Sequence, residues 1–153
     1  MTDLLELLRS VDPNDKTACN ELDCRFFCFL NEDKVFVKMD YGRTFIYSYR
    51  QGSRQSRSAD WQRVPEYTHS LDALNDVQEA ELEGFEVNFE PRFFCKALGD
   101  ATGYYATLIK PIGTTIYEDF INIKSELLPT KELAWMDAIY QTIEWKRSNE
   151  DEQ

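Results

Sequence analysis

Tyr67-Thr-His-Ser-Leu-Asp-Ala-Leu74 begins the part of the sequence that decides the fold, and Leu128-Pro-Thr-Lys-Glu-Leu-Ala-Trp135 ends it. Ser70 is of a residue type that caps helix N-termini, and a helix is predicted after it. A second helix is predicted from Thr130, which follows a proline, to about Arg147. Three strand-like stretches separate the two helices. The predicted order of elements is therefore α-β-β-β-α.

The stretches between the two helices alternate between apolar and polar residues, as half-buried strands do. Phe85, Val87 and Phe89 form the inward-facing set of the first strand. The alternation continues past Pro91 into 93–97, which predicts a sheet edge or a bulge at the proline. Turns of about four or five residues indicate antiparallel hairpins. The later strands are predicted at 104–110 and 115–123, with turns at 99–103 and 111–114.

The first fifty residues predict a pair of helices and a β-hairpin. One helix covers Asp3–Ser10. A turn and helix start are predicted at Asp12-Pro13-Asn14-Asp15, where a proline follows a capping type of residue, and the second helix runs from there to about Leu30. The hairpin joins 34–40 to 43–50, and both stretches are rich in β-branched and aromatic residues.

The second of these helices is apolar on two sides. One face carries Cys19, Leu22, Phe26 and Phe29. The other side carries Cys24, Phe27 and Cys28. A helix of this kind is buried in the interior or covered by another chain. The pattern therefore leaves a homodimer open.

Together these elements predict an α+β fold in which helices sandwich an antiparallel sheet. A length of 153 residues is within the range of one domain, and a single domain is predicted. Its predicted parts are the N-terminal helices with the hairpin (1–50), a basic loop (51–66), the α-β-β-β-α core (67–148) and an acidic tail (149–153).

The chain is acidic, with a formal net charge of −11. A general nucleic-acid binder needs a basic surface to neutralise phosphates, and anionic membranes also attract basic proteins, so both classes are disfavoured. The N-terminus lacks a cationic region, and no stretch of about 20 apolar residues occurs. Neither a signal peptide nor a membrane span is predicted, and a cytoplasmic location is expected.

The four cysteines lack the paired spacing of zinc sites. Cys19, Cys24 and Cys28 lie five and four residues apart, and the chain has a single histidine. Buried thiols are expected, and no metal or other cofactor is predicted.

Two residues could carry catalysis, but a structural role is favoured for both. His69 directly precedes the capping Ser70, and a general base needs an activated partner nearby. Cys95 lies on a predicted strand, where a buried thiol is more common than one activated by the neighbouring Lys96. No catalytic residue is assigned, and the chain is not expected to be an enzyme.

The predicted helix after Ser70 carries a row of carboxylates opposite its apolar side. Like charges at such spacing repel one another, so this face is either solvated or meets a cationic partner. Trp145 joins the candidate partner-binding set because tryptophan is enriched at interfaces. We call Asp72, Asp76, Glu79 and Glu83 the acidic row, and Glu86 and Glu90 are expected to extend it.

A basic segment interrupts this acidic chain. Between Arg43 and Arg63 five arginines and one aspartate give a local charge of +4. Guanidinium groups bind phosphate, and tryptophan can stack on a base. An alternative site for phosphate or nucleic acid is therefore predicted, the other interpretation being a solubilising loop. This arginine segment consists of Arg50, Arg54, Arg57 and Trp61.

Three parts of the sequence resemble the phage ABA-sandwich domain family. Asn14-Asp-Lys16 with Glu21-Leu-Asp23 resembles the family's N-terminal Asp-Arg-Glu-Leu-Asp signature, and 65–73 resembles its Tyr-Thr-x-Ser-Leu-Asp-Ala helix start. The helix from Pro129 resembles the closing Thr-Pro-Ala-Leu-Ala helix. The basic insert at 51–63 departs from the family pattern, and the closing helix is not Ala-rich. The resemblance implies phage or prophage origin and a compact α/β sandwich, but no activity and no site residues.

Two functional hypotheses follow. The first is a small acidic accessory protein that binds a host protein stoichiometrically. The phage resemblance adds the expectation that this partner is a host defence protein, which the chain inhibits. The second is a module that binds a nucleotide or nucleic acid through the arginine segment.

Overall fold

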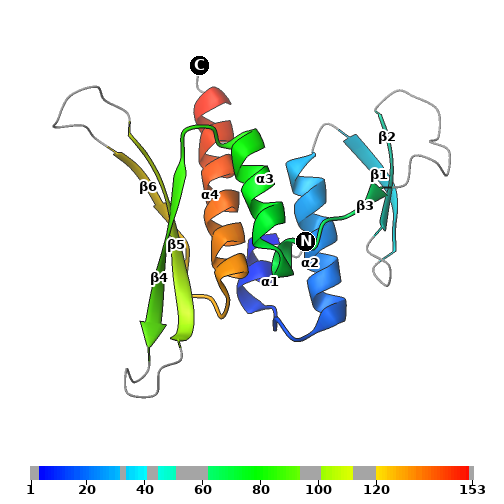
Figure 1. The fold of residues 1–153 in the computed structure, drawn as a ribbon. Coiled ribbons are helices and arrows are strands. Elements are labelled where there is room, and N and C mark those ends of the chain that lie inside the picture. The colour runs from blue at the N-terminus through cyan, green and yellow to red at the C-terminus, as the bar shows by residue number, and fades with distance from the viewer. Residues whose placement is uncertain are drawn as a thin grey trace. The chain divides into compact units, whose positions relative to one another are not determined.

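The computed structural model describes residues 4–31, 34–40, 45–50, 62–93, 101–111 and 120–151. The chain divides into two compact units, Met1–Ser70 and Leu71–Gln153. Figure 1 shows the elements of both units, and each unit is described by itself. The predicted core, 67–148, thus begins inside the first unit, because Tyr67–His69 belongs there and the second unit starts at Leu71.

The first unit contains helices and a three-stranded antiparallel sheet. Strand order in this sheet is β1-β2-β3, and the predicted hairpin forms its first two strands. The register pairs Lys34 with Arg50 and Asp40 with Phe45. The third strand lies within the segment predicted as a loop. The elements are α1 (Leu4–Ser10), α2 (Lys16–Leu30), β1 (Lys34–Asp40), β2 (Phe45–Arg50), β3 (Gln62–Arg63) and the 3-10 helix η2 (Tyr67–His69).

Helix α2 begins later than predicted. The turn predicted at 12–15 is present, but Asp12 does not cap the helix, because its carboxylate accepts a hydrogen bond from Asn14 N–H (2.9 Å) within the turn. Asp15 is the N-cap, and its carboxylate accepts from Ala18 N–H at 3.1 Å. Both aspartates can cap, and the helix starts after the second one.

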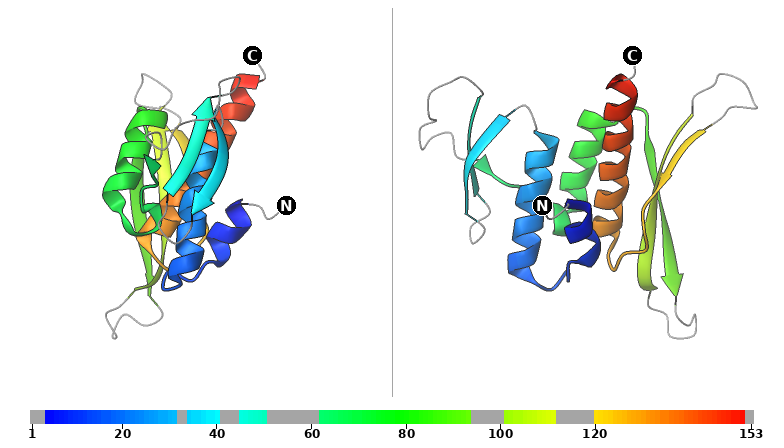
Figure 2. Two further views of the ribbon diagram at one scale, coloured as in Figure 1. Left: turned by 90° about the vertical axis from the view of Figure 1, so that its right-hand side faces the viewer. Right: turned by 180° about the vertical axis from the view of Figure 1, so that it is seen from behind.

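The second unit has the predicted α-β-β-β-α order and an antiparallel sheet, which confirms the α+β class. Both helices lie on the same side of this sheet, and α4 packs against β5 (Figures 1 and 2). The elements are α3 (Leu71–Glu81), β4 (Glu86–Phe93), β5 (Ala101–Pro111), β6 (Phe120–Lys124) and α4 (Lys131–Asp151). Strand β4 continues through Pro91, as the alternation predicted. The part of that prediction at 94–97 lies outside the described residues.

Alternation along β4 decides which side chains meet the helices. Val87 and Phe89 are half-buried, and the Phe89 ring meets the Trp135 ring of α4 edge-on, 5.5 Å between centroids. Their register partners on β5, Leu108 and Ala106, are fully buried. The predicted inward set of β4 is therefore the set that faces α4.

A buried amide connects the two helices of the second unit. Gln78 of α3 accepts a hydrogen bond from the Trp135 indole N–H at 2.7 Å. Its own Nε2 donates to the carbonyl of Phe85 at 3.1 Å, in the turn that leads to β4. Both ends of the Gln78 amide are thus satisfied, which removes most of the cost of burying it.

Helix α4 differs from its prediction at the C-terminal end only. Thr130 caps the helix, because its hydroxyl accepts from Leu133 N–H at 3.1 Å. The helix was predicted to end at about Arg147, before the acidic tail at 149–153, but it continues to Asp151. No glycine or proline interrupts the helix there, so nothing in its last turns ends it earlier.

Gly103 lies inside β5 and not in the predicted turn at 99–103. Tyr104 and Leu128 exchange two backbone hydrogen bonds of 2.7 and 3.0 Å beside it. A Cβ atom at position 103 would lie 3.0 Å from the Leu128 carbonyl oxygen and 3.1 Å from Leu127 Cδ1. Glycine at this position therefore allows the chain before α4 to approach the strand.

We expect Gly103→Ala to lower the free energy of unfolding by about 1–2 kcal/mol, because the Leu128 backbone is held in place by its two hydrogen bonds. Urea unfolding followed by circular dichroism measures the change. The control is Thr107→Ala on the same strand, because the Thr107 side chain forms no hydrogen bond with any described residue, and it should change stability by less than about 0.5 kcal/mol. Equal stability of the two variants would contradict the close approach.

Candidate functional site

The acidic row lies on one exposed side of α3 and the turn that follows it. Asp72, Asp76 and Glu79 are exposed on the helix, and Glu83 is exposed in the turn. Within the described parts of the chain no lysine or arginine forms an ion pair with any of them; Glu79 accepts a hydrogen bond from Asn75 at 3.2 Å. The row is therefore a surface of unneutralised carboxylates.

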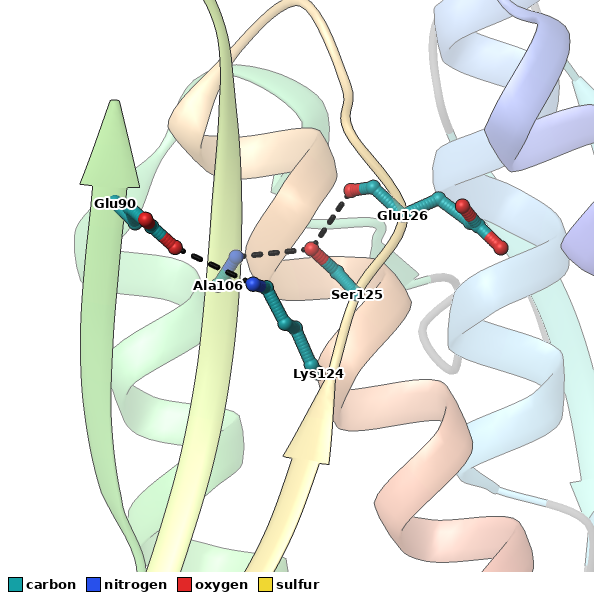
Figure 3. A network of polar contacts seen from close by, with 5 residues as sticks. All are labelled: Glu90, Ala106, Lys124, Ser125 and Glu126. Carbon is teal, nitrogen blue, oxygen red and sulfur yellow. Dashed lines mark hydrogen bonds and ion pairs between the residues drawn. The ribbon is translucent and has the colours of Figure 1, made fainter. Parts of the chain in front are cut away.

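Carboxylates elsewhere do find cationic partners. Glu21 pairs with Arg25 one turn along α2 at 2.9 Å. Glu90 of β4 pairs with Lys124 of β6 at 3.3 Å, and Figure 3 shows this contact reaching across the middle strand. The acidic row differs from these places because the chain supplies it with no such partner among the described residues.

Glu86 and Glu90 do not extend the acidic row. Successive side chains of a strand point to opposite faces of a sheet. Val87 and Phe89 face the helices, so Glu86 and Glu90 lie on the opposite face of the sheet. The helical and strand segments of the predicted set therefore belong to two surfaces of the second unit.

Trp145 lies on α4 with 39% of its surface exposed. The adjacent Lys146 donates a hydrogen bond from Nζ to the carbonyl of Glu81 at 3.1 Å. This contact brings the C-terminal part of α4 beside the C-terminal end of α3. Trp145 is thus available on the surface near the end of the acidic row.

Only one member of the arginine segment lies among the described residues. Arg50 is the last residue of β2 and pairs with Lys34 in the sheet. Arg54, Arg57 and Trp61 lie outside the described residues, and so does Cys95. The phosphate or nucleic-acid site stays a prediction.

A polar network in the first unit was not predicted from the sequence. The carboxyl of Asp23 on α2 is 1% exposed and accepts from Thr68 N–H at 2.9 Å and from the Thr68 hydroxyl at 3.3 Å. The same hydroxyl lies 3.0 Å from His69 Nδ1. His69 Nε2 lies 3.1 Å from the carbonyl oxygen of Pro13. Four residues from three parts of the unit are thus joined.

The hydrogens of this network can be assigned from the acceptors. A carbonyl oxygen only accepts, so His69 Nε2 carries a hydrogen toward Pro13. Burial raises the pKa of Asp23 from 3.8 to about 7, although the hydrogen bonds from Thr68 oppose the rise. The Thr68 hydroxyl has a single hydrogen, which it donates to Asp23 when that carboxyl is ionised. When Asp23 is protonated, the carboxyl can donate to the Thr68 hydroxyl instead, and the hydroxyl hydrogen is then directed to His69 Nδ1. Every member of the chain is satisfied in this arrangement.

A cavity of about 350 Å³ adjoins the network. It lies between the chain that enters α2, the first turns of α2 and the segment 66–69, which includes η2. Cavities of this size are at the lower end of the range for small-molecule sites. It is lined by Pro13, Asn14, Lys16, Cys19, Asn20, Asp23, Glu66 and His69.

The two reactive groups of the cavity are not arranged for catalysis. Cys19 Sγ lies 3.6 Å from the carbonyl oxygen of Asp12, and burial raises the pKa of its thiol, which disfavours the nucleophilic thiolate. Both ring nitrogens of His69 have hydrogen-bond partners. The arrangement is better suited to holding a ligand than to attacking one.

One sequence signal could have revealed the network. Asp23 lies next to buried apolar positions of α2, and a carboxyl there needs a hydrogen-bond partner. Its partner Thr68 lies in the segment that begins at Tyr67. Asp23 and Thr68 are in contact although they are 45 positions apart in the sequence. The partner itself could not be identified from spacing alone.

Comparisons with protein families, with curated proteins and with solved structures found no match for this chain. Among the described residues no group of three or more His, Cys, Asp or Glu side chains could hold a metal ion. None of the helices in the described ranges is long and apolar enough to cross a membrane.

The raised pKa of Asp23 predicts how stability depends on pH. Between pH 3.8 and about 7 the unfolded chain ionises this carboxyl while the folded chain keeps it protonated. Its contribution to stability is therefore fully present below pH 3.8 and is lost as the pH rises through about 7. The titratable groups facing Asp23 are Cys19 on the same helix and Glu66, Tyr67 and His69 from the segment packed against it.

Asp23→Asn should remove this dependence, because its amide can accept from Thr68 N–H and donate to the Thr68 hydroxyl as the protonated acid does. From pH 5.5 to 8.5 the wild type should lose roughly 2 kcal/mol relative to this variant, at about 1.4 kcal/mol per pKa unit. Urea unfolding at several pH values measures the difference. Asp72→Asn, which removes an exposed carboxylate, should run parallel to the wild type. A constant difference for Asp23→Asn would refute the raised pKa.

Proposed function

We propose that this chain acts by stoichiometric binding and that its acidic row engages a basic surface of a partner protein. The single observation that carries the proposal is that Asp72, Asp76, Glu79 and Glu83 are exposed and unneutralised by any described lysine or arginine. Like charges at helical spacing weaken an isolated helix. A cationic partner would relieve that repulsion on binding.

Long-range electrostatics support the same proposal. The net charge of −11 attracts basic surfaces and accelerates their association at low salt. Close contact then needs an apolar anchor within a polar rim, and exposed tryptophan supplies such anchors. Trp145, beside the end of α3, is the residue we assign to this role.

The resemblance to the phage ABA-sandwich domain family suggests which kind of protein the partner is. A phage protein of this kind would meet its partner in the cytoplasm of the host. We propose that the partner is a host defence protein and that binding inhibits it. The first experiment is capture from host lysate with and without nuclease, followed by mass spectrometry.

The double variant Asp76→Lys, Glu79→Lys should weaken binding of the captured partner at least tenfold, because it reverses two charges at the centre of the row. Binding is measured by calorimetry at two salt concentrations, and the wild-type affinity should fall as salt rises. Loss of protection against the defence system in a plating assay should accompany the weaker binding.

The matched control is Glu86→Lys with Asn88→Lys, on the opposite face of the sheet. It brings nearly the same change in net charge but should leave the affinity within about threefold of the wild type. If both double variants weakened partner binding equally, net charge alone would explain the effect. If Asp76→Lys, Glu79→Lys did not weaken binding, the acidic row would not be part of the interface.

A second candidate function is binding of a nucleotide or nucleic acid by the arginine segment. The local charge of +4 within an acidic chain favours it. Partner capture that disappears after nuclease treatment would point to this function.

For this second function we expect an affinity for single-stranded oligonucleotides that falls steeply with salt concentration, because phosphate contacts release counterions. Arg54→Glu with Arg57→Glu should abolish binding in a fluorescence anisotropy assay. The acidic-row variant Asp76→Lys, Glu79→Lys should not weaken it. Unchanged affinity of the arginine variant would exclude the segment as the binding site.

A further inference from the structure

The cavity of the first unit contains a polar side chain with nothing to bind. Asn20 on α2 is 9% exposed and lines the cavity. Its side-chain amide forms no hydrogen bond with any described residue, and the amide atoms are accessible from the cavity. An amide can donate two hydrogen bonds and accept two, and buried polar groups in native proteins are almost always paired. Asn20 is therefore placed to bind a molecule that enters the cavity.

Asp23 provides acceptors beside Asn20. The two residues are three positions apart on α2, so they lie on the same side of the helix. Each carboxyl oxygen of Asp23 accepts one hydrogen bond from Thr68. A cation in the cavity favours the ionised form of Asp23, which has about four acceptor sites, so roughly two remain beside the two bonds from Thr68. The cavity thus offers amide and carboxylate oxygens side by side.

The charges around the cavity favour a cation over an anion. Asp23 and Glu66 line it with carboxyl groups, and the only fixed positive charge among its lining residues is Lys16, which is exposed. Asp15 caps α2 with its own carboxylate and so occupies the helix end that would otherwise attract an anion. The whole chain adds a negative field.

We infer that the cavity is a binding site for a small organic cation whose amine or guanidinium group donates hydrogen bonds to Asn20 and Asp23. The cavity volume suits a molecule of metabolite size. This site lies in the first unit and is independent of the function proposed for the acidic row, which lies in the second. The same chemistry is found in a free alkylguanidine and in the arginine side chain of a protein.

The test is a titration of the full chain observed by NMR through the side-chain amide of Asn20 and the ring of His69. The probes are agmatine, acetyl-arginine-amide as a stand-in for a protein arginine, and AMP as an anion. Saturable shifts with either cationic probe support the site, and the stronger of the two identifies its source. Saturation with AMP alone, or with none of the three at about 10 mM, overturns it.

Two variants and one control make the result specific. Asn20→Ala should weaken binding at least tenfold while the helix is retained, because alanine has the highest helix propensity. Lys16→Glu should tighten binding about threefold, since it replaces a repelling charge at a helix start where glutamate is favourable. Lys131→Glu makes the same change at the first residue of α4 and should leave the affinity unchanged.

Each of the two variants tests the site even if the other does not fold. If Asn20→Ala does not fold, Lys16→Glu still decides, because weaker binding by that variant would mean that the ligand is an anion and would overturn the inference. Equal tightening by Lys16→Glu and Lys131→Glu would show attraction by net charge without a site. Circular dichroism of each variant verifies the fold before titration.

Discussion

The first unit depends on how the Asp23 carboxyl is buried. An isolated carboxylate in such a place would cost several kcal/mol. Burial raises the pKa of Asp23 to about 7, so the carboxyl can be buried in its protonated form, and Thr68 forms hydrogen bonds with both of its oxygens. The contact fixes the segment before the second unit onto α2. His69 follows directly in sequence, and its bond to Pro13 holds the chain that enters α2. The wall of the cavity is therefore a consequence of one buried acid.

The second unit divides its charges between two surfaces. On the open face of the sheet Glu90 is neutralised by Lys124, whose ammonium also lies 4.2 Å from the centre of the Tyr105 ring. On α3 the acidic row has no such neutralisation among the described residues. The periodicities of helix and strand explain this division. In a helix, residues three or four positions apart lie on the same side, whereas in a strand successive residues point to opposite faces of the sheet.

Sequence patterns predicted most of the elements but missed β3 and the candidate site. Alternation along 85–93 correctly predicted which residues face the helices. In a sheet with one covered face, the apolar residues of an alternating strand must all point toward that face. The start of α2 was misplaced because Asp12 and Asp15 can both cap. The contact of Asp23 with Thr68 and the position of Gly103 beside Leu128 depend on approaches between distant segments. No local pattern encodes such approaches.

The buried indole of Trp135 gives this molecule an optical property. Its N–H donates a hydrogen bond to Gln78, its ring lies against that of Phe89, and 5% of its surface is exposed. Trp145 on the same helix is 39% exposed. Indoles in such different surroundings emit at different wavelengths. A red shift in the fluorescence of Trp135 would therefore report loosening of α4 from the sheet, and emission from Trp145 would respond to molecules that settle on the outside of that helix.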